Sequence, residues 1–353
     1  MRAWPPERDD ERAGDKRRKA ELAELEAAGI DLDPTHPHDH ADDHAHDDHD
    51  QTDEHAHPHV RSGPGEPPAI GIIGAGAVGT ALGVALSRAG WPVVAAASRD
   101  AARRERFRSL VPGARTFAEP NALLDEVELI IVAVPDDAIA SVAGSVRMYS
   151  GQAMVHTSGA LGPEVLGAAM AAGTQVGAFH PLVAFADTER AVEALNGATI
   201  AIEGDDQLAA LLAEMAEALG AQPVRLAAGS KAAYHAAAVL AAGGFVALLD
   251  AIAELGRVAG LDEAGSLAIY GQLIEQTLDN ARALGIRAAL TGPITRGDQG
   301  TVESHIAALR AHAPDVIPLY LAAADREIAL AEARGALTPD AAERLRSLLA
   351  TAS

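Results

Sequence analysis

Short apolar runs separated by helical stretches dominate the chain from residue 68 to about residue 228. Runs typical of buried parallel strands are bounded by Gly, Pro or polar turns at 69–73, 93–97, 129–134 and 153–157. Shorter runs predict strands at 176–179, 198–202 and 223–226, and helical spacing predicts helices at 77–89 and 206–219. Strands that alternate with helices indicate an α/β fold with a doubly wound parallel sheet over about residues 69–228.

The pattern changes after Gly229, where no further strand run occurs. Apolar positions at helical spacing predict helices at 231–259, 262–284, 301–312, 316–334 and 340–350. We therefore expect an all-helical C-terminal domain over residues 229–353.

Residues 1–68 differ from both of these regions. A short charged helix is possible at 15–28, but residues 31–59 are mostly Asp, His and Pro and cannot bury an apolar core. We expect a disordered, acidic, His-rich tail and linker. Its nine histidines could loosely chelate Zn²⁺, Ni²⁺ or Cu²⁺, or could belong to a solvated tail or to sequence upstream of the true translation start. They are His36, His38, His40, His44, His46, His49, His55, His57 and His59.

Composition narrows the possible partners. The formal charge of −22 argues against nucleic acid and anionic lipid as partners. The chain has no cysteine, which excludes disulfides and thiolate chemistry. Neither a signal-peptide core nor a run of 18 consecutive apolar residues is present, so we expect a cytoplasmic protein without a membrane span.

A glycine-rich turn follows the first predicted strand. Gly74-Ala75-Gly76-Ala77-Val78-Gly79 matches G-x-G-x-x-G, between an apolar strand and a helix. In this context Gly74 permits the tight turn, Gly76 permits a pyrophosphate to approach the backbone, and Gly79 permits the helix to pack on the strand. We predict a dinucleotide site, with the pyrophosphate at the helix N-terminus.

The end of the second strand indicates which dinucleotide binds. An NAD site places an acidic residue there, whereas this strand is followed by Ser98 and Arg99, with Arg103 and Arg104 beyond. A hydroxyl and guanidinium groups suit a 2′-phosphate, and Asp100 is expected to cap the next helix. NADP is therefore favoured over NAD. Val134 ends the 129–134 strand run and Pro135 follows it, and both are expected to border the cofactor.

Candidate reactive side chains fall at strand ends and at the start of the first long helix. His180 ends an apolar run, and Ser158 follows a strand whose His156 could be either functional or structural. Lys231 and His235 are spaced i, i+4 and share a helix face. Because the two domains should meet there, we predict Lys231, His235 and His180 as catalytic residues and Ser158 as a substrate ligand.

A second candidate segment interrupts the helical region between residues 291 and 301. Arg296 could hold a substrate carboxylate in a bidentate fork, and Thr291 lies at the start of the same loop. Asp298 could orient Arg296 or cap the helix that begins near Thr301. We predict substrate contacts from Thr291, Arg296 and Asp298, with a purely structural loop as the alternative.

Taken in order, several motifs resemble one family. The family is that of Rossmann-like predicted oxidoreductases with a C-terminal helical domain of unknown function, and the resemblance covers about residues 69–350. The motifs are Gly74-Ala75-Gly76, Val134-Pro135-Asp136, His156-Thr157-Ser158-Gly159, His180-Pro181-Leu182 and the segment from Thr291 to Asp298.

The resemblance extends to ketopantoate and pyrroline-5-carboxylate reductases and implies a homodimer. It also implies that Lys231 is a proton donor, whereas His235 stands where ketopantoate reductases have Asn. The sequence thus predicts an NADPH-dependent reductase of a small 2-keto acid, with ketopantoate preferred. The alternatives are a cyclic-imine reductase, and a non-catalytic NADP-binding sensor or scaffold whose tail buffers metal.

Overall fold

The computed structural model describes residues 66–227 and 229–352 of the chain. The predicted N-terminal tail lies outside these residues, except for its last three positions, and so do its nine histidines. The expectations of disorder and of loose metal binding there remain predictions.

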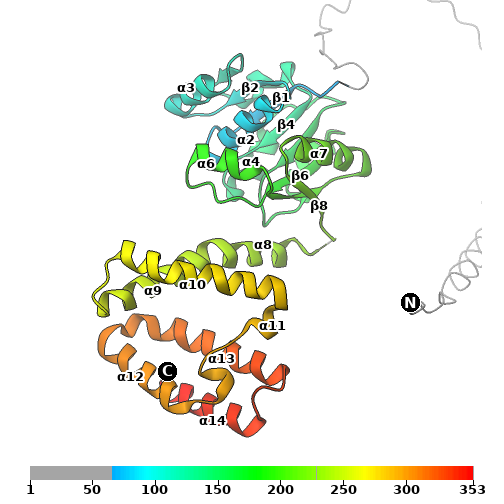
Figure 1. Ribbon diagram of the computed structural model, residues 1–353. Helices are drawn as coiled ribbons and strands as arrows, with labels where there is room; N and C mark the ends of the chain where they lie inside the picture. Colours follow the sequence, from blue (N-terminus) through cyan, green and yellow to red (C-terminus); the bar gives the residue numbers. More distant parts are fainter. Residues whose placement is uncertain (1–65, 228, 353) are drawn as a thin grey trace, which may run out of the picture. The chain divides into compact units, whose positions relative to one another are not determined.

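Eight strands form one sheet in the order β3-β2-β1-β4-β5-β6-β7-β8 (Figure 1). Neighbouring strands are parallel except for the antiparallel pair β6 and β7. In chain order the strands are Ile70–Ile73, Val93–Ala97, Arg115–Phe117, Leu129–Val132, Ala153–His156, Gln175–Pro181, Thr199–Glu203 and Gln222–Arg225. The expected doubly wound α/β sheet is confirmed, except that β7 and β8 run opposite to the other six strands, which periodicity alone could not reveal.

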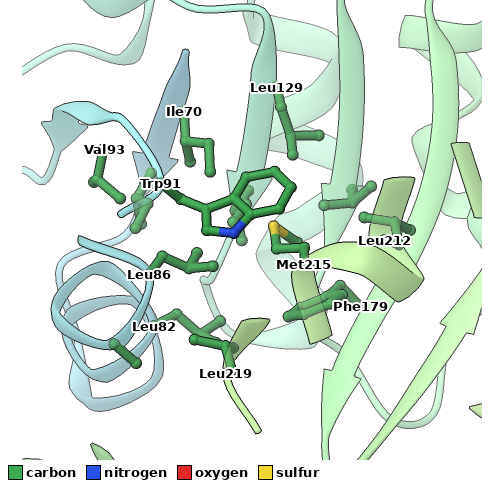
Figure 2. Packing of buried hydrophobic residues seen from close by; sticks show 14 of the residues in the cluster. Ile70, Leu82, Leu86, Trp91, Val93, Leu129, Phe179, Leu212, Met215 and Leu219 are labelled. Atoms are coloured by element: carbon green, nitrogen blue, oxygen red, sulfur yellow. The ribbon is translucent and has the colours of Figure 1, made fainter. Parts of the chain in front are cut away.

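Side chains alternate between two apolar layers because successive residues of a strand point to opposite faces. Ile70 and Ile72 of β1 belong to one cluster, with Trp91, Phe179 and Met215, and Figure 2 shows Trp91 at its centre. The next residue of the strand, Ile73, belongs to the cluster on the other face. Both faces of the sheet are therefore covered, as a parallel sheet requires.

Helices from different parts of the sequence close these layers. The first cluster includes residues of α2 (Ala77–Arg88), α6 (Thr188–Leu195) and α7 (Asp206–Ala218). The second includes residues of the 3-10 segment η1 (Pro120–Glu126) and of α4 (Asp136–Ser145) and α5 (Gly167–Ala171). The remaining helix, α3 (Ala101–Leu110), contributes Phe107 to the first cluster.

All elements from Lys231 to the end of the described chain are helical. The predicted helix at 231–259 is observed, but it carries a π-helical segment, η3 (Leu240–Gly244). The helices are α8 (Lys231–Val239), α9 (Phe245–Val258), α10 (Glu263–Leu284), α11 (Ile286–Ala289), α12 (Gln299–His312), α13 (Ile317–Ala333) and α14 (Pro339–Ala350). Residues of α12, α13 and α14 form a core that includes Val302, Ile328 and Leu345.

The helix from Lys231 to Val258 is apolar yet little buried. Its most apolar window has a mean hydropathy of 2.1, and 11% of that window is buried. By length and composition it is the one helix in the described residues that could cross a membrane, which the search for unbroken apolar runs did not anticipate. An apolar surface of this kind generally marks a contact site.

Candidate active site

The glycine turn after β1 has the geometry of a phosphate cradle. Gly74 has a φ of +108°, and a Cβ placed there would lie 2.2 Å from the Ala133 carbonyl oxygen. A Cβ at Gly79 would lie 2.0 Å from the Gly74 carbonyl oxygen. Both positions therefore require glycine for the fold of the turn itself.

Gly76 differs from these two glycines. A Cβ there would meet only the Arg103 Nη1 atom, at 3.9 Å. Gly76 is also the N-cap of α2, and no side chain caps that helix end. The first amides of α2 therefore remain available for a pyrophosphate, and the space over Gly76 allows it to approach the backbone.

The residues after β2 separate into structural and available groups. Asp100 caps α3, as predicted, and accepts hydrogen bonds from the Ala102 and Arg103 amides at 2.8 and 3.1 Å. Arg104 donates from Nη1 to the carbonyl oxygens of Ser98 and Arg99 at 2.6 and 3.0 Å. Asp100 is thus committed to the helix, which favours a phosphate at this position over a ribose hydroxyl.

The side chains of Ser98, Arg99 and Arg103 surround the end of β2. The Ser98 hydroxyl accepts from the Asp100 amide at 3.3 Å and can still donate its own proton. Arg99 is exposed, and Arg103 reaches back toward Gly76. These three residues fit a 2′-phosphate. On the other side of the cradle, Val134 lies against Gly74 and Pro135 is the N-cap of α4.

The turn after β5 is held by His156. This histidine is fully buried, its Nδ1 accepts from the Ser158 amide at 3.2 Å, and its Nε2 lies 3.1 Å from the Gly162 carbonyl oxygen. Burial, assisted by the charge of Lys231, lowers the pKa of His156 to about 4. His156 is therefore a neutral structural residue, and it fixes the turn in which Ser158 accepts from the Ala160 and Leu161 amides, both at 3.1 Å.

Two histidines from distant parts of the chain meet beside that turn. The rings of His180, in β6, and His235, in α8, are 5.7 Å apart with an interplanar angle of 77°. A Cβ at Gly159 would lie 2.2 Å from His235 Nδ1 and 2.6 Å from His180 Nε2, so glycine is needed to admit both rings. Tyr234 completes the group, with its ring 6.0 Å from that of His180.

Three polar atoms of this group are buried and have no hydrogen-bond partner among the residues that the structure describes: His180 Nδ1, His235 Nδ1 and Tyr234 Oη. Burial, together with the charges of His235 and Lys231, lowers the pKa of His180 to about 4, so that its imidazole is neutral near pH 7. A buried polar atom without a partner is costly, and such atoms commonly mark a ligand site.

Lys231 lies next to this group in an ion pair. Its Nζ contacts Glu203 Oε2 at the end of β7, and the two side chains are 7% and 19% exposed. The structure thus brings Lys231, His235 and His180 together near Ser158, as expected. It adds two residues that the sequence analysis missed, Glu203 and Tyr234. Only the pairing of β6 with β7 could have indicated Glu203.

The loop from Thr291 to Asp298 is built into the helical region. Ile294 is buried in the core of α12, α13 and α14. Asp298 caps α12, accepting from the Thr301 amide at 3.1 Å and from its hydroxyl at 2.7 Å. Thr291 and Arg296 are exposed. The capping alternative for Asp298 is therefore confirmed, and the substrate contacts stay predictions.

Among the described residues, no group of three or more His, Asp or Glu side chains could hold a metal ion. The cluster around His180 consists of an ion pair, two imidazoles and a phenol. It can form hydrogen bonds with a small polar group placed at the carboxyl edge of β5 and β6, where ligands of such sheets bind.

Comparison with known families and structures agrees with this architecture. A Rossmann-like domain matches residues 61–181, and the domain of unknown function DUF2520 matches residues 198–327. No protein of curated function matches the chain in sequence.

Three solved structures illustrate the likeness. A Bacteroides fragilis protein, provisionally assigned as an NADP oxidoreductase, is 24% identical with a TM-score of 0.62, covering 74% of this chain and 98% of its own. A reductive aminase from Aspergillus terreus, in complex with NADPH and ethyl-5-oxohexanoate, is 18% identical, with a TM-score of 0.52 and coverages of 81% and 93%. A 1-pyrroline-5-carboxylate reductase from Streptococcus pyogenes is 16% identical, with a TM-score of 0.53 and coverages of 80% and 99%. At these identities the likeness concerns the fold.

Proposed function

We propose that this chain, which belongs to the family of Rossmann-like proteins with a C-terminal DUF2520 domain, is an NADP-dependent reductase. The observation that carries the proposal is the cradle at Gly74–Gly79. Two of its glycines have no room for a side chain, whereas Gly76 is open beside Arg103. The likeness to reductases determined with NADPH supports the same cofactor.

Individual residues have separate roles in holding this cofactor. The free amides at the start of α2 would bind the pyrophosphate. Ser98, Arg99 and Arg103 would bind the 2′-phosphate, since Asp100 already caps α3 through Oδ1 and pairs through Oδ2 with Arg103 Nε at 3.6 Å. When bound, NADPH supplies a hydride to a polar double bond. The His180, His235 and Lys231 group would orient that bond, at the carboxyl edge of the same sheet.

The substrate is a small compound with a C=O or C=N bond. For a 2-keto acid such as ketopantoate, Lys231 would donate a proton or polarise the carbonyl, and Arg296 would need to approach as the carboxylate ligand. For a cyclic imine, the polar group around His180 would hold the nitrogen. The likeness to a pyrroline-carboxylate reductase and a reductive aminase supports the second class.

We further propose that the protein is cytoplasmic and that it forms a homodimer, the latter as the resemblance implies. Support comes from the exposed apolar side chains of the long helices. Leu240 is 73% exposed, Val246 is 62% exposed and Leu273 is 59% exposed. A second copy of the chain offers an equally apolar surface to cover them.

Thermal unfolding with NADP⁺ and NAD⁺ tests the cofactor assignment, because a ligand that binds the native state raises the melting temperature. We expect a larger rise with NADP⁺. Arg103→Gln should weaken NADP⁺ binding by about tenfold while sparing NAD⁺, as loss of one charge-assisted contact implies. Arg108→Gln, on the same helix, is the matched control, since Arg108 forms a surface pair with the exposed Glu105.

Oxidation of NADPH with a panel of 2-keto acids and cyclic imines then tests catalysis. Turnover of either class supports a reductase. Tight NADPH binding with no turnover of any compound would instead favour the non-catalytic sensor, and failure of both dinucleotides to bind would remove the proposal altogether.

A further inference from the structure

Tyr234 lies on the same helix face as Lys231 and His235, because residues three and four apart in a helix are neighbours. Its ring meets the His180 ring edge-on, with the centroids 6.0 Å apart and an interplanar angle of 84°. Its hydroxyl oxygen is buried and has no hydrogen-bond partner among the residues that the structure describes. The phenol therefore adds a free O–H group to the polar side chains beside the Gly159 turn.

Reduction of a carbonyl or of a neutral imine needs a proton as well as a hydride. Addition of hydride to the carbon moves the π electrons of the double bond to the oxygen or nitrogen, and that atom must then take up a proton. An acid suited to this step is protonated near pH 7 and can lose its proton without breaking a buried ion pair.

Lys231 is held back from this role by its ion pair. Its ammonium contacts Glu203 Oε2, and the two side chains are 7% and 19% exposed. Loss of the ammonium proton would leave the Glu203 carboxylate charged, largely buried and without its partner, which is the costly state of a buried pair. Lys231 therefore keeps its proton, and its charge can still polarise a bound substrate.

His180 does not fill the role either. Burial, assisted by the charges of His235 and Lys231, lowers the pKa of His180 to about 4, so that its ring is neutral near pH 7. A neutral imidazole can donate a hydrogen bond but does not carry the second proton that makes imidazolium an acid. Burial has the opposite consequence for Tyr234, because it raises the pKa of the phenol and keeps the hydroxyl group protonated.

We infer that Tyr234 is the proton donor of the reaction, giving its hydroxyl proton to the oxygen or nitrogen of the substrate double bond as hydride adds to the carbon. The inference rests on the proposed reductase function and names a catalytic residue that the sequence analysis missed. The products are an alcohol or amine, NADP⁺ and the Tyr234 phenolate, which regains its proton from water. Lys231, still paired with Glu203, lies on the same helix face and stabilises the negative charge of the phenolate.

Tyr234→Phe tests this role because it removes only the hydroxyl group. With the panel compound that the unmodified enzyme reduces fastest, we expect kcat to fall by about a hundredfold or more, as loss of a general acid implies. KM and the NADP⁺ dissociation constant, measured by calorimetry, should change little. Tyr270→Phe, which removes a phenolic hydroxyl from α10, is the matched control and should leave all three quantities unchanged.

Lys231→Arg separates the lysine from the tyrosine. Arginine keeps the positive charge that faces Glu203, but its guanidinium holds its proton too tightly to act as an acid. We expect kcat to fall by no more than about tenfold in this variant. His235→Asn removes the second imidazole as a source of protons and should also cost less than Tyr234→Phe.

The ionisation of Tyr234 gives a readout that does not depend on turnover. It must be separated from that of the other titratable groups of the site, which are Asp136 of α4, His156 of β5, His180 of β6, Glu203 of β7, and Lys231 and His235 of α8. Phenolate absorbance is therefore followed with NADPH bound, and the curve of Tyr234→Phe is subtracted from that of the unmodified protein.

The midpoint of this difference should lie above the ordinary phenol value of 10.0, since burial raises the pKa of Tyr234. The kcat/KM value at saturating NADPH should fall as the pH rises through the same midpoint, because only the protonated phenol can donate. In Lys231→Arg this fall should persist, since arginine does not titrate in that range.

The inference is overturned if Tyr234→Phe keeps more than about a tenth of kcat, or if Lys231→Arg or His235→Asn loses as much activity as Tyr234→Phe. It is also overturned if kcat/KM and the phenolate absorbance change at different pH values. Loss of NADP⁺ binding in Tyr234→Phe alone would assign Tyr234 a structural role instead. Failure of the proposed function is seen separately, because the unmodified protein would then bind no NADP⁺ or reduce no panel compound.

Discussion

The sheet region and the first long helices use the same kinds of side chain with opposite results. In the sheet region, strand residues such as Ile70 and Leu129 are fully buried between two layers of helices. In the helix from Lys231 to Val258 and in α10, residues such as Leu240 and Leu273 are more than half exposed. A sheet covered on both faces completes its own core, whereas two apolar helices complete theirs only when another surface covers them.

The largest expected effect is on the oligomeric state, when charged residues replace apolar ones on the exposed helices. Leu240→Glu with Leu273→Glu should convert a dimer to a monomer, since burying each leucine contributes about 1.5–3 kcal/mol and a buried unpaired carboxylate costs more. The dissociation constant should rise by about a hundredfold or more. Light scattering coupled to size-exclusion chromatography measures the mass directly.

The matched control for that experiment is Met170→Glu, which changes an apolar residue 51% exposed on the sheet region and should leave the mass unchanged. A monomeric unmodified protein would contradict the proposed dimer. Recovery of the unmodified protein only with detergent would assign the same apolar surface to a membrane.

Within the sheet region, substitutions at two glycines of the cradle should distinguish an effect on folding from an effect on cofactor binding. Gly79→Ala forces a Cβ against the Gly74 carbonyl oxygen and should cost about 1–3 kcal/mol of folding free energy. Gly76→Ala meets nothing closer than 3.9 Å, so the protein should fold normally but lose NADP⁺ affinity, because the methyl group occupies the path of the pyrophosphate. Unfolding in urea, with and without NADP⁺, measures both quantities.

Gly144→Ala serves as the control, since an added Cβ at that position of α4 meets no atom within 4 Å. Its folding free energy and its NADP⁺ affinity should match those of the unmodified protein or show slightly greater stability. Unchanged NADP⁺ affinity in Gly76→Ala would mean that the cofactor does not use this cradle.

An effect of similar size, confined to low pH, should follow from the buried histidine of the β5 turn. The pKa of His156 is about 4 in the folded protein and near 6.5 when unfolded, so the unfolded state takes up a proton first as the pH falls. Stability is full above pH 6.5 and declines between pH 6.5 and 4, by up to about 3 kcal/mol from this residue.

Urea unfolding of the unmodified protein and of His156→Asn at pH 7.5, 6 and 5 isolates that contribution. His180, whose pKa is also lowered to about 4, contributes equally to both proteins, so the difference between them reports on His156. An equal loss of stability in the two proteins would show that His156 does not carry the effect.

Much of the sheet region could be predicted from the sequence, because the residue patterns that indicate its strands and turns are local. Apolar runs as short as β1 and β4, and the glycines that follow β1, specify their conformation within a few residues. Helix starts were equally local. Asp100 and Asp298 cap α3 and α12 through bonds to amides only two or three residues away.

The tertiary structure alone decided the features that depend on distant partners. The three-residue edge strand β3 is too short and polar to predict, and β7 is antiparallel to β6 because of pairing across the sheet, not because of its own composition. That pairing brings Glu203 within reach of Lys231, 28 residues later, whereas the missing side chain of Gly159 admits the rings of His180 and His235. The sequence determined by itself that a dinucleotide cradle exists and which helices follow it. Only the packed chain decided that Lys231 pairs with Glu203, because an ion pair depends on distance in space and not on separation along the chain.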